Sequence, residues 1–333
     1  MAVIDITKLV PYKVTASLSD KILLMYGEMG TRKTSVACCF PKHLLLAYDI
    51  GYKFIDGANA VPLQTWQDFK SVVKQLDKKD VHEMYETVVI DTIGMAYTAC
   101  YNYMLTQMGV ESPGDVPFGM GWKKIRIEFE TVLRSIVQKG YGLVMLAHSD
   151  EVEKEDASTK QVQTVVKIDI DKRPDLVIKT LADIVLYLHK EPQDENKDIP
   201  TVYAYSNLVT IPTKKRCRYF SDRFEFTYEN LQKEMANAVA QLLNKDELTT
   251  DDFAPTSTNP YAVEKVDFEE VRANTISIAS ALMDHGYESQ VSEILTNIFK
   301  GNRLSELVDS KDNLNKLQVA LSTLEDLKER AKL

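Results

Sequence analysis

The segment that most constrains the fold is 26–37, YGEMGTRKTSVA, which follows the apolar run KILLM. It departs by one residue from the phosphate-binding pattern G-x-x-x-x-G-K-S/T, because Arg32 stands where the second glycine belongs. Gly27, Lys33 and Thr34 occupy the other fixed positions. In this pattern a glycine-rich turn joins a buried strand to a helix. We therefore expect a strand that ends at the first glycine and a helix that begins at the lysine.

The chemistry of this segment is that of phosphate binding. Backbone N–H groups of the turn and the start of the helix would hold the β-phosphate, the Lys33 ammonium would reach the β- and γ-phosphate oxygens, and the Thr34 hydroxyl would bind Mg²⁺. The predicted nucleotide-binding residues form one continuous run: Gly27, Glu28, Met29, Gly30, Thr31, Arg32, Lys33, Thr34 and Ser35. The sequence thus predicts ATP and Mg²⁺ as cofactors.

Arg32 is the unfavourable residue of the loop. Glycine tolerates a left-handed backbone at this position, whereas arginine loses about 1 kcal/mol in that conformation. In exchange, the guanidinium could lie near the phosphates or pair with Glu28. Because Lys33 and Thr34 are kept, the sequence favours a modified but functional site, with a binding-only pseudo-ATPase as the alternative.

A second acidic motif follows the phosphate loop in the order that a nucleotide site requires. The apolar run TVVID ends on Asp91, which matches the Walker B pattern, where an acidic residue at the end of a strand holds Mg²⁺ through water. The joint occurrence of the two motifs is far more specific than either one alone. Thr34 and Asp91 are therefore the predicted metal ligands.

Apolar runs alternate with segments of helical period along the first two thirds of the chain. Continuous leucine and β-branched runs are typical of strands buried on both faces of a parallel sheet. With helices between them, they predict an α/β fold in which a mainly parallel twisted sheet is flanked by helices. The predicted strands lie at 21–27, 43–49, 85–92, 142–149 and 182–190, with edge strands at 201–207 and 223–229.

The pattern changes toward the C-terminus. Residues 246–265 are rich in Pro, Thr, Ser and Asp, which predicts a linker, and only helical periodicity follows them. The predicted division is an ATPase core at 1–245, a linker at 246–265 and a small all-helical domain at 266–333. Acidic residues of that domain, such as Asp267 and Glu269, disfavour DNA binding there and favour a protein partner.

Composition excludes several classes of protein. The net charge of −9 gives no general attraction to nucleic acid or anionic membrane, so any DNA contact requires a local basic patch. The four cysteines show neither a metal-ligand spacing nor a disulfide framework. Without a signal peptide or an apolar run near about 18 residues, the chain is predicted to be cytoplasmic, with no membrane partner.

Residues 20–228 resemble a known family. Four strings carry the resemblance: KTSVA in the phosphate loop, LLLAYDIGYKF, GLVMLAHSDE and LVTIPTKKRCRYFSDRFEF. They are similar to segments of the RecA-like ATPases, and among these to phage-encoded RecA-like proteins associated with single-strand annealing and recombination. The resemblance implies a RecA-like P-loop NTPase core and, if the chain is phage-encoded, a bacterial host cell.

The resemblance also implies catalytic roles beyond the phosphate loop. Asp49 matches the acidic catalytic base, and His148 matches the polar residue that senses the γ-phosphate. A basic finger similar to that of RecA relatives would complete the site of a neighbouring subunit, so the active form would be a ring or filament. The candidate catalytic residues are Lys33, Asp49, Asp91, His148, Lys214, Lys215 and Arg216.

The residues alone leave simpler roles open for some of these positions. Asp49 could cap the following turn, and it is one methylene shorter than the glutamate usual in RecA. His148 could be a hydrogen-bonded histidine at the edge of the sheet. The string TKKRCR could be a solvated hairpin.

Two segments occupy the places where RecA-like proteins hold single-stranded DNA on loops, 111–129 and 150–179. The first places aromatic side chains beside cations, as sequence-tolerant binding requires, because bases stack on the rings and phosphates pair with the basic groups. Trp122 could instead be a helix-packing residue, and the second segment holds as many acids as bases. The candidate DNA-binding residues are Phe118, Trp122, Lys123, Lys124, Arg126, Lys160 and Lys167.

These features together predict a DNA-stimulated, Mg²⁺-dependent ATPase that acts on single-stranded DNA in phage recombination or replication. The expected partners are single-stranded DNA, further copies of the chain, and a single-strand-binding or other replication protein at the helical domain. The alternatives are a nucleotide-gated binding module with little turnover that loads or recruits a partner, and a ring helicase or helicase loader.

Overall fold

The computed structural model describes residues 11–155, 162–191, 200–255, 267–301, 303–331 and 333. They belong to two compact units, one within 12–262 and the other within 263–333 together with Pro11. No helix in the described ranges is long and apolar enough to cross a membrane.

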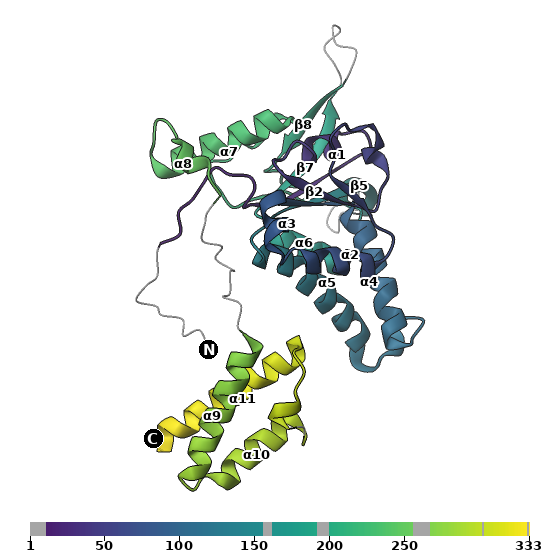
Figure 1. The fold of residues 1–333 in the computed structure, drawn as a ribbon. Coiled ribbons are helices and arrows are strands. Elements are labelled where there is room, and N and C mark those ends of the chain that lie inside the picture. The colour runs from purple at the N-terminus through teal and green to yellow at the C-terminus, as the bar shows by residue number, and fades with distance from the viewer. Residues whose placement is uncertain (1–10, 156–161, 192–199, 256–266, 302, 332) are drawn as a thin grey trace. The chain divides into compact units, whose positions relative to one another are not determined.

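The larger unit is built on one sheet (Figure 1). Its described strands are β1 (Ile22–Gly27), β2 (His43–Ala47), β3 (Ala60–Pro62), β4 (Thr87–Asp91), β5 (Gly142–Glu155), β6 (Val162–Ile168), β7 (Ile184–Glu191), β8 (Thr201–Tyr205), β9 (Lys214–Lys215) and β10 (Arg223–Glu225). The order is β10-β8-β7-β1-β5-β4-β2-β3, with β6 paired to β5 and β9 paired to β7. The strands from β7 to β3 in this order are parallel, and β6, β8, β9 and β10 pair antiparallel.

Helices cover both faces of this sheet (Figure 1). The helices are α1 (Lys33–Ala37), α2 (Trp66–Gln75), α3 (Lys79–Met84), α4 (Ile93–Met108), α5 (Met120–Gln138), α6 (Lys172–Leu181), α7 (Tyr228–Leu243) and α8 (Thr250–Phe253), with 3₁₀ turns η2 (Gly51–Phe54), η3 (Pro113–Asp115) and η4 (Pro117–Gly119). Buried side chains of α2, α4, α5 and α6 pack on one face, and those of α1 and α7 pack on the other. The predicted α/β class is confirmed.

Strand β1 shows why the sequence has continuous apolar runs. All of its residues are buried, with Leu24 and Tyr26 on the face covered by α2, α4, α5 and α6, while Leu23 and Met25 lie on the face covered by α1 and α7. A strand covered on both faces needs apolar side chains at every position rather than at every second one. The buried parallel strands end along one edge of the sheet, which is where open α/β sheets bind ligands.

The segment 150–179 differs from its prediction as a polar loop. Strand β5 continues past the sheet as a two-stranded ribbon with β6, and α6 follows the ribbon. Val152 pairs directly with Val165 in the ribbon. Cross-strand pairs of β-branched residues stabilise such a ribbon, and this preference prevails over the many charges of the segment.

The predicted linker 246–265 begins with residues that pack on the larger unit. Helix α8 lies there, and its Asp252 side chain is fully buried. The carboxylate accepts hydrogen bonds from Lys245 Nζ at 2.8 Å and from the Thr249 backbone N–H at 2.9 Å, and these bonds hold the pKa of Asp252 well below its usual range. Polar composition alone does not reveal that the Asp252 carboxylate is buried. The predicted boundaries of the linker, 246–265, stay predictions.

The smaller unit is helical, as expected. It contains α9 (Phe268–Asp284), α10 (Glu288–Phe299), η5 (Leu304–Glu306) and α11 (Lys311–Ala331). Leu282, Val291 and Leu324 join the three helices in one buried cluster. The Asp267 carboxylate caps α9 by accepting the N–H groups of Glu269 and Glu270, so acids that were predicted to repel DNA also stabilise the start of a helix.

Candidate nucleotide site

The phosphate loop leaves the sheet at the end of β1. A Cβ at Gly27 would lie 2.2 Å from the Leu188 carbonyl oxygen of β7, so the position has no room for a side chain. Gly30 has a φ of 76°, which favours glycine, and α1 begins at Lys33. The predicted sequence of strand, turn and helix is therefore present.

Lys33 turns back into this loop. Its side chain is buried, and Nζ donates hydrogen bonds to the backbone oxygens of Gly27 and Glu28, both at 2.9 Å, and to Thr31 Oγ1 at 3.2 Å. Burial lowers the pKa of Lys33 to about 8, although the nearby Asp91 carboxylate acts in the opposite direction. The ammonium is thus held in a small polar cage, with its charge largely kept at neutral pH.

Thr34 and Asp91 form the second part of the site. The Thr34 hydroxyl donates to Asp91 Oδ2 over 2.6 Å, and Asp91 is 4% exposed. Burial raises the pKa of Asp91, the Thr34 hydrogen bond opposes that rise, and the charge of Asp49 adds to it. Two neighbouring oxygen donors suit Mg²⁺, which keeps water and phosphate oxygens as its remaining ligands. The described part of the chain holds no group of three or more His, Cys, Asp or Glu side chains able to bind a metal.

One cavity of about 320 Å³ brings the predicted residues together. Residues 29–35 of the phosphate loop line it, and so do Asp49, Asp91 and His148, together with Gly51 and Ile55. Strand register explains the convergence, because Gly27 of β1 pairs with His148 of β5 and Asp91 of β4 pairs with Ala47 of β2, two residues before Asp49. Parallel strands with aligned ends place all of these groups at one edge.

Asp49 and His148 both line the cavity, and their predicted roles stay predictions. The Asp49 carboxylate accepts the Ile50 N–H at 2.6 Å and also lines the cavity, so capping of the turn and access to the nucleotide are compatible. His148 Nδ1 is buried and has no hydrogen-bond partner among the described residues, and His148 also lines the cavity. An unsatisfied buried nitrogen is costly unless another group meets it.

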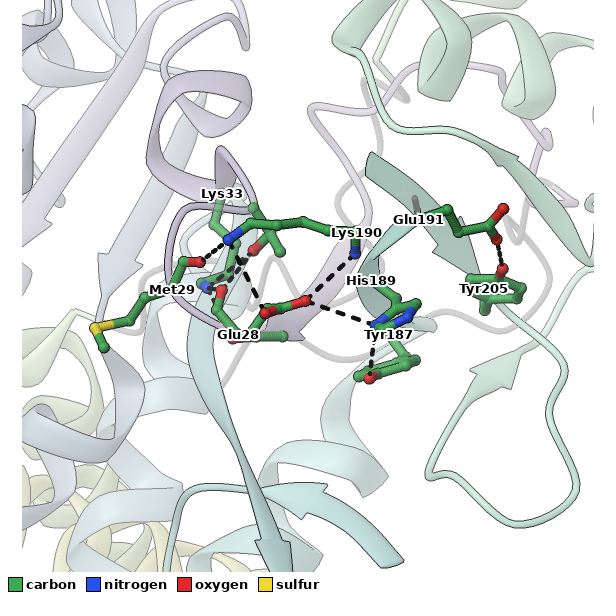
Figure 2. A network of polar contacts seen from close by, with 10 residues as sticks. Glu28, Met29, Lys33, Tyr187, His189, Lys190, Glu191 and Tyr205 are labelled. Atoms are coloured by element: carbon green, nitrogen blue, oxygen red, sulfur yellow. Dashed lines mark hydrogen bonds and ion pairs between the residues drawn. The ribbon is translucent and has the colours of Figure 1, made fainter. Parts of the chain in front are cut away.

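Arg32 has the backbone conformation that the missing glycine would favour. Its φ is 60° and its ψ is 22°, in the left-handed region. The side chain is exposed and lines the cavity. Glu28 does not turn toward Arg32 as one hypothesis had it; its carboxylate lies 3.6 Å from His189 Nδ1 and 3.9 Å from Lys190 Nζ (Figure 2).

Replacing Arg32 by glycine should raise the free energy of unfolding by about 1 kcal/mol, because it removes the steric cost of the left-handed backbone. Urea denaturation would measure the change. The matched control is Ser35→Gly, at an exposed position inside α1, where glycine should instead destabilise by about 0.5–1 kcal/mol. Equal destabilisation by both variants would mean that Arg32 is not strained.

The predicted basic finger lies away from this cavity. Strand β9 pairs with Ile184 and Val185 at the amino end of β7, the opposite edge of the sheet from the phosphate loop. Lys214 Nζ donates to backbone oxygens at the end of α6, including that of Ala182 at 2.6 Å, and Arg216 pairs with Asp183 at 2.9 Å. Lys215 bonds to the Phe220 backbone oxygen and to Asp222. The hydrogen bonds of Lys214 satisfy the last carbonyls of α6. A role for residues 214–216 in a neighbouring subunit's site stays a prediction.

Part of the predicted DNA-binding set forms a groove between α5 and α6. Trp122, Lys123 and Arg126 line it together with Lys172, Arg173 and Leu176, around a volume of about 690 Å³. The Arg173 guanidinium lies 4.1 Å from the centre of the Trp122 ring. Trp122 belongs to helix α5 rather than to a loop and also contacts Tyr101, with ring centres 6.0 Å apart.

The other predicted DNA-binding residues lie elsewhere. Phe118 is fully exposed in η4, and Lys124 is exposed on α5 but does not line the groove. Lys167 is on the β5–β6 ribbon, paired with Asp150 at 3.0 Å. Lys160 lies outside the described residues.

Sequence reasoning missed the contribution of β7 to the phosphate loop. His189 and Lys190 follow an apolar run and contact Glu28 of the loop. Polar residues at the carboxyl end of a parallel strand were a usable signal, since such ends gather at the ligand edge of the sheet.

Three comparisons place this chain among known proteins. A family model described as an AAA domain matches residues 19–220, a range that contains the phosphate loop, Asp91 and His148. The SPbeta prophage-derived uncharacterized protein YorG of Bacillus subtilis (strain 168) is 28% identical over 321 residues, which cover 94% of this chain and 95% of that protein. The crystal structure of the RadB recombinase aligns with 56% of this chain and 80% of its own, at 11% identity and a TM-score of 0.32.

Proposed function

The chain belongs to the AAA domain family of P-loop nucleoside triphosphatases, and we propose that it is a Mg²⁺-dependent ATPase acting on single-stranded DNA in phage recombination or replication. The observation that carries this proposal is the single cavity that unites the phosphate loop with Asp49, Asp91 and His148. A site with a buried ammonium, a hydroxyl–carboxylate pair and two further polar groups is suited to phosphoryl transfer, which depends on positioning and charge.

Each residue has a defined part in the proposed reaction. Lys33 exchanges its bonds to the loop carbonyls for the β- and γ-phosphate oxygens of ATP. Thr34 and Asp91 would hold Mg²⁺, which supplies positive charge at the phosphate oxygens when bound. Asp49 orients the attacking water and accepts its proton. His148 of β5 hydrogen-bonds the γ-phosphate, so release of this phosphate changes the contacts of β5.

The DNA part of the proposal is supported by the groove between α5 and α6. In a chain of net charge −9, this groove gathers Lys123, Arg126, Lys172 and Arg173 around the Trp122 ring. Cations beside an aromatic ring suit single-stranded nucleic acid without sequence preference. The prophage origin stated for the Bacillus relative supports a phage setting.

ATP turnover measured with and without single-stranded DNA tests the proposal. We expect hydrolysis that requires Mg²⁺ and rises at least about tenfold with DNA, because a cation supplied by a neighbouring subunit would stabilise the transition state. Particle mass followed in parallel should rise when ATP and DNA are both present. Absence of hydrolysis under every condition would contradict the enzyme assignment.

A second candidate is favoured by the left-handed Arg32, which puts a bulky cation where phosphate approaches the backbone. In this reading the chain is a nucleotide-gated binding module with little turnover, which recruits a protein partner through its helical unit. Tight ATP binding without hydrolysis, with hydrolysis restored by Arg32→Gly, would select this candidate.

A further inference from the structure

The carboxyl end of β7 contacts the outer side of the phosphate loop. Strand β7 runs parallel to β1, and their last paired residues are Leu188 and Gly27. The next two residues of β7, His189 and Lys190, therefore lie beside the first residues of the loop. Figure 2 shows Lys190 reaching over the loop toward Met29, with Glu28 between Lys190 and His189.

Lys190 makes several contacts with this turn. Its Nζ donates to the Met29 backbone oxygen over 2.6 Å and lies 3.9 Å from Glu28 Oε2. Its backbone N–H donates to Glu28 Oε1 at 3.4 Å. A Cβ at Gly30 would come within 3.0 Å of Lys190 Nζ, so the side chain also packs directly on the turn.

Apart from these contacts with β7, residues 28–30 of the turn are exposed. Met29 is 77% exposed, whereas Thr31 and Lys33 are buried and bond the loop from within. The following helix α1 is only five residues long. A short exposed turn loses much backbone entropy when it is fixed, so a contact that fixes it beforehand favours ligand binding.

We propose that Lys190 is a positioning residue of the nucleotide site, which holds the Met29–Gly30 turn in the shape that the phosphates of the nucleotide require. The inference rests on the proposed nucleotide-binding function and adds a strand, β7, to the site. Lys190 does not line the cavity itself, so its effect reaches the nucleotide through the loop. It should therefore act on diphosphates and triphosphates alike.

Nucleotide binding by Lys190→Met and Lys190→Arg tests this role. Lys190→Met should weaken the binding of ADP and of ATP by the same factor, about tenfold, because it removes a charge-assisted hydrogen bond to the loop. The turnover number at saturating ATP should change by less than about twofold, since the effect is on binding of every state. Lys190→Arg should recover most of the affinity, because its guanidinium can donate to the same carbonyl.

The matched control is Glu191→Gln, the next residue on the same strand. Its carboxylate contacts Tyr205 and Arg223 rather than the loop, so nucleotide affinity should not change. Unchanged affinity in Lys190→Met would overturn the proposal. So would a loss restricted to ATP with a fall in turnover number, because Lys190 would then act on the γ-phosphate.

Hydrogen exchange without nucleotide separates this proposal from the proposed function. In Lys190→Met, the amides of residues 28–34 should exchange about tenfold faster than in the unsubstituted protein and in Glu191→Gln. If the unsubstituted protein binds no nucleotide, the proposed function fails, while faster exchange still establishes that Lys190 holds the turn. Unchanged exchange would refute the positioning role whatever the protein binds.

Discussion

Lys33→Ala should reduce ATP turnover by about a thousandfold and weaken nucleotide binding. The ammonium is the buried cation of the phosphate loop, with Nζ 2.9 Å from the backbone oxygens of Gly27 and Glu28. Removing one preorganised donor from a transition state that spreads charge over phosphate oxygens costs about 10²–10³ in rate, and a charged donor lies at the upper end. Steady-state hydrolysis and calorimetric titration with ADP would measure the two effects.

Loss of Lys33 also removes three hydrogen bonds within the loop, so folding has to be checked in the same experiment. The variant should melt cooperatively, because the loop lies at the edge of a sheet whose core is unchanged. Lys74→Ala makes the same substitution at an exposed position of α2 and should leave turnover unaltered. Turnover within about tenfold of the unsubstituted protein would place the catalytic site elsewhere.

The sequence was sufficient to predict which groups meet at one edge of the sheet. Gly27, Asp91 and His148 each end a buried apolar run or follow one directly, and such runs are typical of parallel strands. Parallel strands align their carboxyl ends, so residues far apart in the chain meet without any local signal that joins them. The loop pattern then predicted which edge binds phosphate.

Strand order explains why the sequence did not predict the contact between Lys190 and the phosphate loop. Lys190 contacts the phosphate loop only because β7 is the neighbour of β1, and nothing in the local pattern of either strand specifies that neighbour. For the basic string at 214–216, the sequence predicted a role at the nucleotide site, but the fold places the string away from the cavity. The resemblance to RecA relatives implied a basic finger there, whereas in this chain Lys214 and Arg216 bond to groups at the end of α6 and just before β7.

The sequence predicted only some of the residues that line the groove between α5 and α6. Trp122 and Lys123 were predicted to bind DNA because an aromatic side chain stands beside cations, whereas Arg173 belongs to a segment predicted as a second loop. The helical period of α5 separates neighbours along the chain, so that Lys123 lines the groove and Lys124 does not. Sequence composition treats these two lysines as equal, and the fold distinguishes them.

The double variant Trp122→Ala, Lys123→Ala should weaken single-stranded DNA binding by roughly 30- to 100-fold. Stacking of a base on an aromatic side chain contributes about 1–3 kcal/mol, and the lysine adds one phosphate contact. Loss of that contact should reduce the slope of log affinity against log salt by about 0.7. Fluorescence anisotropy with a labelled oligonucleotide at several salt concentrations would measure both quantities.

Lys124→Ala is the matched control for this experiment, because it removes the same charge from the same helix outside the groove. It should leave affinity nearly unchanged, whereas a binding surface set by charge alone would respond equally to either lysine. Trp122→Phe should keep most of the affinity by retaining a ring beside Arg173. If the double variant folds and binds DNA with unaltered affinity and salt slope, Trp122 is a packing residue between Tyr101 and Arg173, and the DNA site lies on another surface.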